Sequence, residues 1–237
     1  GFNTAGPIGQ MFTGAVGSPT PHYRADTLWN YEAGAKATLW DGRVQARSAV
    51  FLARWSDIQS DQFLPSGLAY AVNVGDASNL GIELETTWRP TSHLEIRANG
   101  LLADPEITRP SASFNTKGDA GLPGVPAVSA NLNASYLRPI WRDISVSAEG
   151  GVAYVGASRL TFDAERRSRM GDYVTGRFSI GLEASRWSLR AFVENPLDTQ
   201  ANTFSFGDPF RLPEALTTTP LQPRTIGLRL SVNPFGD

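Results

Sequence analysis

The 237-residue chain contains no cysteine, which excludes disulfide scaffolds and thiolate metal sites. Its two histidines, His22 and His93, lie in no serine and aspartate pattern that would indicate a catalytic triad. Lysine and arginine number 21 against 23 acidic residues, so there is no basic surplus to indicate nucleic-acid binding. No apolar run reaches the roughly 18 residues of a membrane-spanning helix. We therefore expect a protein that is not an enzyme and that holds no metal or cofactor.

Apolar and polar residues alternate with a period of two along most of the chain. In residues 79–102, Leu80, Ile82 and Leu84 alternate with small or charged residues, a turn follows at Pro90, and the same alternation then resumes. Successive side chains of a strand point to opposite faces of a sheet. The sequence therefore predicts hairpins with one apolar face and one charged face.

Nine such strands can be counted from residue 28 onward. Their connections alternate in length: tight turns stand at Asp41, Pro90, Pro139 and Ser185. Loops of a dozen or more residues are expected between these hairpins, after Gln59, Leu102, Val155 and Glu194. Aromatic residues stand near both ends of the strands, for example Trp88 beside a tight turn and Tyr31 near a long loop.

Alternation alone does not decide which solvent meets the apolar face, because a soluble β-sandwich alternates in the same way. Short turns at one end, long loops at the other and aromatic belts at both ends favour an outer-membrane barrel with lipid outside and a polar lumen. The predicted fold is therefore an all-β, antiparallel transmembrane β-barrel. Because bacterial barrels have an even number of strands, nine indicate an arc of a larger barrel. The alternatives are an autotransporter translocator, a porin, a barrel enzyme or a soluble β-sandwich binding module.

Two regions are expected. Residues 1–27 are rich in Gly, Pro, Thr and Ser and predict an irregular extracellular loop or the end of a preceding strand, and residues 28–237 predict the barrel segment. The chain opens on Gly1, with neither an initiator methionine nor a signal peptide. We interpret it as a processed product or a piece of a longer chain.

Several blocks resemble the C-terminal half of the barrel of TonB-dependent outer-membrane receptors. They are Asn30 to Lys36 with Asp41-Gly42-Arg43, Phe51 to Gln59, Asn73 to Ala77, Gly81 to Glu85, Pro126 to Tyr136, Phe192 to Asp198 and Arg224 to Leu230. The resemblance covers most of the chain from Leu28 onward. One departure is Phe235, which is out of step with the apolar face of the last strand and is followed by Gly236 and Asp237.

The resemblance implies a roughly 22-stranded barrel, occluded by a plug domain, in the outer membrane of a Gram-negative bacterium. It implies as partners the lipid bilayer and lipopolysaccharide, the plug and remaining strands of the same receptor, and TonB, which would act through an N-terminal part that this chain lacks. It also implies import of a scarce nutrient, most commonly a ferric siderophore, with oligosaccharides or other nutrients as the alternatives. The sequence does not choose the ligand.

Two sets of residues are candidates for function. Loop residues that could capture a ligand, instead of being solvated, touching lipopolysaccharide or packing the loop on itself, are Arg109, Lys117, Asp163, Arg166, Arg167, Phe204 and Phe206. Charges expected in the lumen could line a transport path, or could pair across strands and dock the plug; they are Glu83, Glu85, Arg97, Arg177, Arg190 and Arg229.

Overall fold

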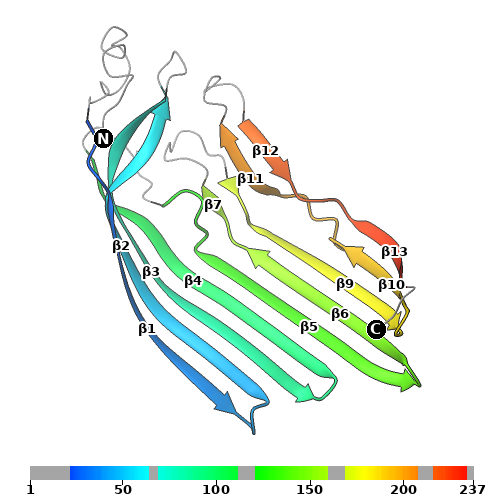
Figure 1. The fold of residues 1–237 in the computed structure, drawn as a ribbon. Coiled ribbons are helices and arrows are strands. Elements are labelled where there is room, and N and C mark those ends of the chain that lie inside the picture. Colours follow the sequence, from blue (N-terminus) through cyan, green and yellow to red (C-terminus); the bar gives the residue numbers. More distant parts are fainter. Residues whose placement is uncertain (1–21, 64–68, 112–120, 160–168, 208–215, 234–237) are drawn as a thin grey trace.

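One antiparallel sheet of nine strands makes up most of the described part of the chain (Figure 1). The computed structural model describes residues 22–63, 69–111, 121–159, 169–207 and 216–233. In the described residues no helix is long and apolar enough to cross a membrane. The strand order is β1-β2-β3-β4-β5-β6-β9-β10-β13. The bounds are β1 Thr27–Leu39, β2 Val44–Phe63, β3 Ala69–Thr91, β4 Leu94–Pro110, β5 Val128–Trp141, β6 Ile144–Val155, β9 Tyr173–Glu183, β10 Trp187–Glu194 and β13 Thr225–Val232.

Two small sheets lie in the connections that follow β6 and β10. One pairs β7 (Ser158–Arg159) with β8 (Arg169–Met170), and the other pairs β11 (Asn202–Gly207) with β12 (Leu216–Pro220). The sequence predicts loops without strands in both places. Strands of two to six residues carry too little alternation to be recognised from sequence, so their pairing depends on contacts between distant segments.

The four predicted tight turns are confirmed, and they lie together at one end of the sheet (Figure 1). Between β1 and β2 the chain reverses at Asp41 and Gly42, whose φ angles are 53° and 84°. Asp-Gly suits this turn because positive φ costs glycine nothing and aspartate little. The described parts of the long connections, among them β7, β8, β11 and β12, lie at the opposite end (Figure 1).

The prediction of a dozen-residue loop after Gln59 is wrong. β2 continues to Phe63 and β3 begins at Ala69, and these two residues still pair. The loop expected after Leu102 also starts later, because β4 continues to Pro110. The ladder shifts register between Trp55 and Gln59, which breaks the period of two and hides the continuing strand from a pattern reading.

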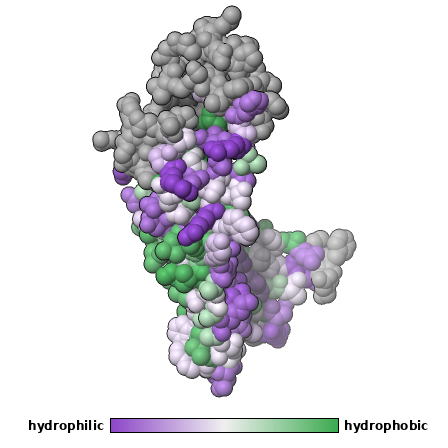
Figure 2. Space-filling view, turned by 90° about the vertical axis from the view of Figure 1, so that its left-hand side faces the viewer, coloured by the Kyte–Doolittle hydropathy of each residue, from purple (hydrophilic) through white to green (hydrophobic). Residues whose placement is uncertain are grey.

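The two faces of the sheet differ in polarity, as the alternation predicts. On the apolar face Leu84, Leu132, Ile180 and Leu228 are 53%, 53%, 60% and 77% exposed, so no protein layer covers them in the described part of the chain. Seen from the β1 edge, apolar side chains gather on one side and hydrophilic ones on the other (Figure 2). A contiguous apolar surface of this extent indicates contact with a membrane or another protein.

The only cluster of buried apolar side chains in the described residues lies beyond the membrane-length part of the strands, at the end with long connections. Ile58, Val74 and Ala77 are 2%, 0% and 3% exposed, and Trp55, Val72 and Leu122 pack against them. This small core joins β2 and β3 to the connection that follows β4. The long-loop end is thus a packed unit.

Candidate functional site

An ion-pair network on the polar face ties three strands together. Arg190 of β10 lies 2.8 Å from Glu183 of β9 and 3.0 Å from Glu149 of β6, measured between guanidinium nitrogens and carboxylate oxygens. The register places these residues on one face of neighbouring strands. Two carboxylates thereby share one planar, five-donor cation, which fits the fork geometry of arginine. Arg190 thus pairs with carboxylates of two neighbouring strands.

Other polar-face charges divide into paired and unpaired ones. Arg47 lies 3.4 Å from Glu85 across β2 and β3, and Arg97 pairs with Glu95 on its own strand. Arg229 lies over the Phe192 ring, with 5.6 Å from its Cζ to the ring centroid. Three predicted lumenal charges make no ion pair with another described residue: Glu83, Arg177 and Arg229.

A polar groove of about 750 Å³ runs along this face over β4 to β6, β9, β10 and β13. Cations, carboxylates and amides all line it, and they come from several strands and from the connection between β10 and β13. The charged and amide side chains that line it are Glu95, Arg97, Asn131, Asn133, Glu149, Arg177, Arg190, Glu194, Asn195, Gln222 and Arg229. Such a surface suits a hydrated, polar occupant.

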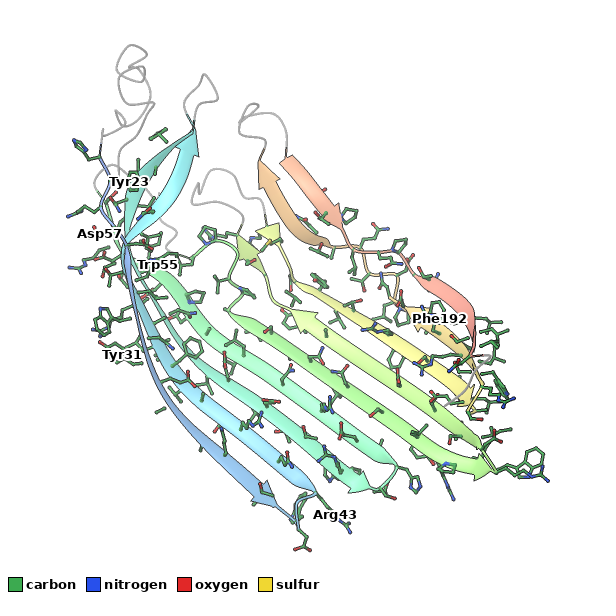
Figure 3. The ribbon with its side chains drawn as sticks, in the orientation of Figure 1. Tyr23, Tyr31, Arg43, Trp55, Asp57 and Phe192 are labelled. Atoms are coloured by element: carbon green, nitrogen blue, oxygen red, sulfur yellow. The ribbon has the colours of Figure 1, made fainter. Side chains whose placement is uncertain are left out.

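A network of carboxylates and cations surrounds the point between Trp55 and Gln59 where the β2–β3 ladder shifts register. We call this point, at the long-loop end of the two strands, the bend. Tyr23, Trp55 and Asp57 lie together there, whereas Arg43 lies at the tight turn at the opposite end (Figure 3). Asp57 pairs with Arg24 at 3.0 Å, and its backbone N–H donates to Asp76 Oδ1 at 2.9 Å.

Predicted ligand residue Arg109 belongs to this network. Arg109 lies directly opposite Asp76 in the β3–β4 register, and the pair is 2.8 Å apart. Gly75 is required beside them, because its φ is 133° and a Cβ would lie 2.1 Å from the Arg109 carbonyl oxygen. These residues surround a polar pocket of about 470 Å³. Arg109 is thus already engaged by a carboxylate.

Hydrogen bonds link described residues of three long connections, those after β4, β6 and β10, and we call these linked residues the rim. The Gly124 N–H donates to the Arg159 carbonyl at 2.7 Å, which links the connection after β4 to β7. The Gly171 N–H donates to the Asn202 carbonyl at 3.0 Å, and Asn202 Nδ2 donates to the Arg169 carbonyl at 3.3 Å, which links β8 to β11. Arg159 and Arg169 lie opposite each other in the β7–β8 pair, so two cations flank the segment 160–168.

Asn195, which the sequence reading did not single out, closes the connection between β10 and β13. Asn195 is 3% exposed, and its φ of 48° is in the left-handed region. Asn195 Nδ2 donates to the carbonyls of Thr199 (3.0 Å) and Gln222 (2.8 Å), and Oδ1 accepts from the Thr199 N–H (2.9 Å). The sequence Asn-Pro-Leu-Asp directly after a strand could have indicated this turn. Asparagine and aspartate both tolerate the left-handed conformation that such turns need.

The remaining predicted loop residues are only partly placed. Phe204 and Phe206 lie on β11, opposite Thr219 and Thr217. Lys117, Asp163, Arg166 and Arg167 lie outside the described residues, as does Phe235. In the hairpin beyond the bend, burial raises the pKa of the Tyr70 hydroxyl above its ordinary value, so this tyrosine is neutral at physiological pH.

Residues 1–195 match the family model described as TonB dependent receptor-like, beta-barrel. Several solved uptake receptors and transporters share the fold. The ferric yersiniabactin uptake receptor FyuA from Yersinia pestis is 24% identical with a TM-score of 0.69, over 90% of this chain and 32% of that one. The ferric-catecholate import receptor Fiu from E. coli K12 is 17% identical with a TM-score of 0.64, over 91% and 29%. The copper transporter OprC is 16% identical with a TM-score of 0.60, over 88% and 31%. This chain therefore spans about a third of the length of these solved proteins.

Proposed function

Because the chain belongs to the TonB-dependent receptor β-barrel family, we propose that it forms wall and outer loops of a receptor that imports a ferric siderophore. TonB-dependent receptors are outer-membrane transporters of Gram-negative bacteria rather than enzymes. The observation that carries the proposal is the family match over residues 1–195, on a sheet with one apolar and one polar face. In this assignment residues 28–237 are barrel wall, and residues 1–27 belong to an outer loop or a preceding strand.

The short turns would face the periplasm and the long connections the cell exterior, as in other bacterial barrels. The hydrogen-bonded rim and the packed hairpin of β2 and β3 would then stand above the membrane. Both would form walls of the vestibule where a ligand first arrives.

A chelated metal fits this chain better than a bare soft ion. The chain contains no cysteine, two methionines and two histidines, whereas copper(I) is held by soft thiolate and thioether ligands. Ferric chelates carry carboxylate, catecholate or hydroxamate oxygens, which arginine and aromatic side chains can recognise. Of the solved proteins compared above, FyuA and Fiu are receptors of ferric compounds and OprC is a copper transporter.

The candidate capture residues are Arg166 and Arg167, in the segment that Arg159 and Arg169 flank, together with Phe204 and Phe206 of β11. Four arginines against Asp163 and Glu165 make residues 159–169 net cationic, which would attract an anionic chelate. Arg109 would act differently, by holding the bend through Asp76.

The polar face would meet the plug. Arg190, Arg47 and Arg97 are engaged with carboxylates of the wall, so they would stiffen it. Glu83 and Arg177 make no ion pair with another described residue, which leaves them for groups of the plug. Energy from TonB would reach the plug and not this wall directly.

The test is uptake by cells that depend on the full-length receptor. A receptor-deleted strain is complemented with the wild type, with R166Q/R167Q or with R43Q/R186Q, whose neutralised arginines stand at the tight turns. We expect R166Q/R167Q alone to reduce uptake of ⁵⁵Fe-siderophore by about tenfold, since a charge-assisted contact contributes about 1.5–3 kcal/mol. Copper-dependent growth without any ferric-siderophore uptake would contradict the proposed ligand.

A further inference from the structure

A shallow apolar groove crosses the apolar face over β5, β6 and β9, with lining residues also from β4, β10 and β13. It has a volume of about 570 Å³. Its floor consists of small residues, Ala134, Ala148 and Gly150, and larger side chains rise on both sides. The larger lining residues on the apolar face are Leu94, Tyr136, Phe178, Ile180, Val193 and Ile226.

The strand register explains the groove. Ala134 pairs with Gly150, which pairs with Phe178, and in the next apolar-face row Ala148 lies between Tyr136 and Ile180. Strands are about 4.8 Å apart, so small side chains on adjacent strands leave a trough beside the larger ones. The Phe178 ring leans over Gly150, where a Cβ would lie 2.9 Å from its Cδ1.

A cation stands on the same face at the tight-turn end of the trough. Arg138 follows Tyr136 by two residues, so its Cα lies about 7 Å further toward the turn. It pairs with Val146, whose side chain belongs to the apolar face. Arg138 is exposed and makes no contact with another described side chain that would neutralise it.

The surroundings of Arg138 are aromatic and basic. The His93 ring lies 6.5 Å from the Tyr136 ring, and the Arg142 guanidinium lies 5.1 Å from the Trp141 ring centroid. Trp141 is 63% exposed. Aromatic side chains of this kind mark the boundary between hydrocarbon and headgroups in outer-membrane barrels. The Asp143 carboxylate in the same turn accepts a hydrogen bond from Ser185.

We propose that this groove and Arg138 bind one glycerophospholipid of the periplasmic leaflet, with an acyl chain in the trough and the phosphate on the guanidinium. An arginine at the hydrocarbon boundary needs an anionic partner, and phosphate accepts two parallel N–H bonds from its fork. The apolar floor offers an acyl chain contacts that a uniformly bulky strand surface lacks. The tight turns face the periplasm, where the leaflet contains glycerophospholipid rather than lipopolysaccharide.

The proposal depends on the membrane orientation of the family and not on which nutrient is imported. Loss of siderophore uptake would therefore leave it intact.

The experiment is native mass spectrometry of the full-length receptor, released from mild detergent after extraction from outer membranes. Wild type is compared with R138Q, with A148L, which fills the trough, and with R43Q as a matched loss of one arginine at another tight turn. We expect an adduct of phospholipid mass on wild type and R43Q. R138Q should retain it about tenfold less, because one charge-assisted contact is lost.

A148L should lose the adduct although it keeps the cation, and R138K should retain more of it than R138Q because the charge remains. Heat-modifiable migration of each variant on gels verifies that the barrel is folded. Equal adducts on wild type, R138Q and A148L would overturn the proposal. An adduct with the mass of lipid A that R138Q or A148L removes would also overturn it, because that lipid belongs to the outer leaflet.

Discussion

Asn195 offers a sharp energetic test, because three hydrogen bonds converge on one buried side chain. Each contributes about 1 kcal/mol net, so removing the amide costs about 3 kcal/mol. The φ of 48° adds about 1 kcal/mol for alanine but nothing for glycine. We therefore expect the full-length receptor to lose about 4 kcal/mol with N195A and about 3 kcal/mol with N195G. N195D should cost at least as much as N195A, because a carboxylate oxygen would face the Thr199 and Gln222 carbonyls.

The assay is urea unfolding in detergent micelles, followed by tryptophan fluorescence. N99D is the matched control, since Asn99 is exposed on the polar face and its side chain makes no described hydrogen bond; it should shift stability by less than about 0.5 kcal/mol. Protease cleavage between β10 and β13 should increase in the same order as the loss of stability. If N195A and N195G unfold at the wild-type urea concentration, Asn195 does not close this connection.

Two further substitutions test the polar face. G227A should lower the free energy of unfolding by about 1–3 kcal/mol, because a Cβ there would lie 2.5 Å from Phe192 Cζ. F192A in the same chain should remove most of this penalty. A penalty that F192A leaves unchanged would contradict the packing. R190Q should lower the free energy of unfolding by about 1 kcal/mol, because Arg190 holds carboxylates of two neighbouring strands. Its coupling energy to E183Q should shrink in 1 M salt. Additive effects in the double-mutant cycle would show that the ion pair contributes nothing.

The sheet was predictable because its signals are local. Period-two alternation identifies each strand, and Asp41-Gly42 fixes a reversal through backbone conformation alone. The nine strands and four tight turns of the prediction match the sheet order. Alternation also assigns Leu132 to the apolar face and Asn131 to the polar face without any knowledge of neighbouring strands.

The long-loop end was not predictable in the same way, because its structure depends on contacts between distant segments. Asp57 and Gly75 take positive φ where strands shift register, so the pattern breaks while pairing continues. The β7–β8 and β11–β12 pairs are hydrogen-bonded to other connections, and these contacts join segments far apart in the sequence. The partners of Arg190 are likewise set by register across three strands and not by sequence spacing.

Site-directed spin labelling of the full-length receptor in lipid bilayers tests the central claim most directly, namely that lipid bathes the apolar face. This chain has no cysteine, so L132C, I180C, N131C and R177C add single labelling sites to it. We predict that labels at 132 and 180 collide readily with oxygen and poorly with a water-soluble nickel chelate, while those at 131 and 177 do not collide readily with oxygen. Labels at 132 and 180 that are protected from oxygen, or that meet the nickel chelate freely, would contradict the account.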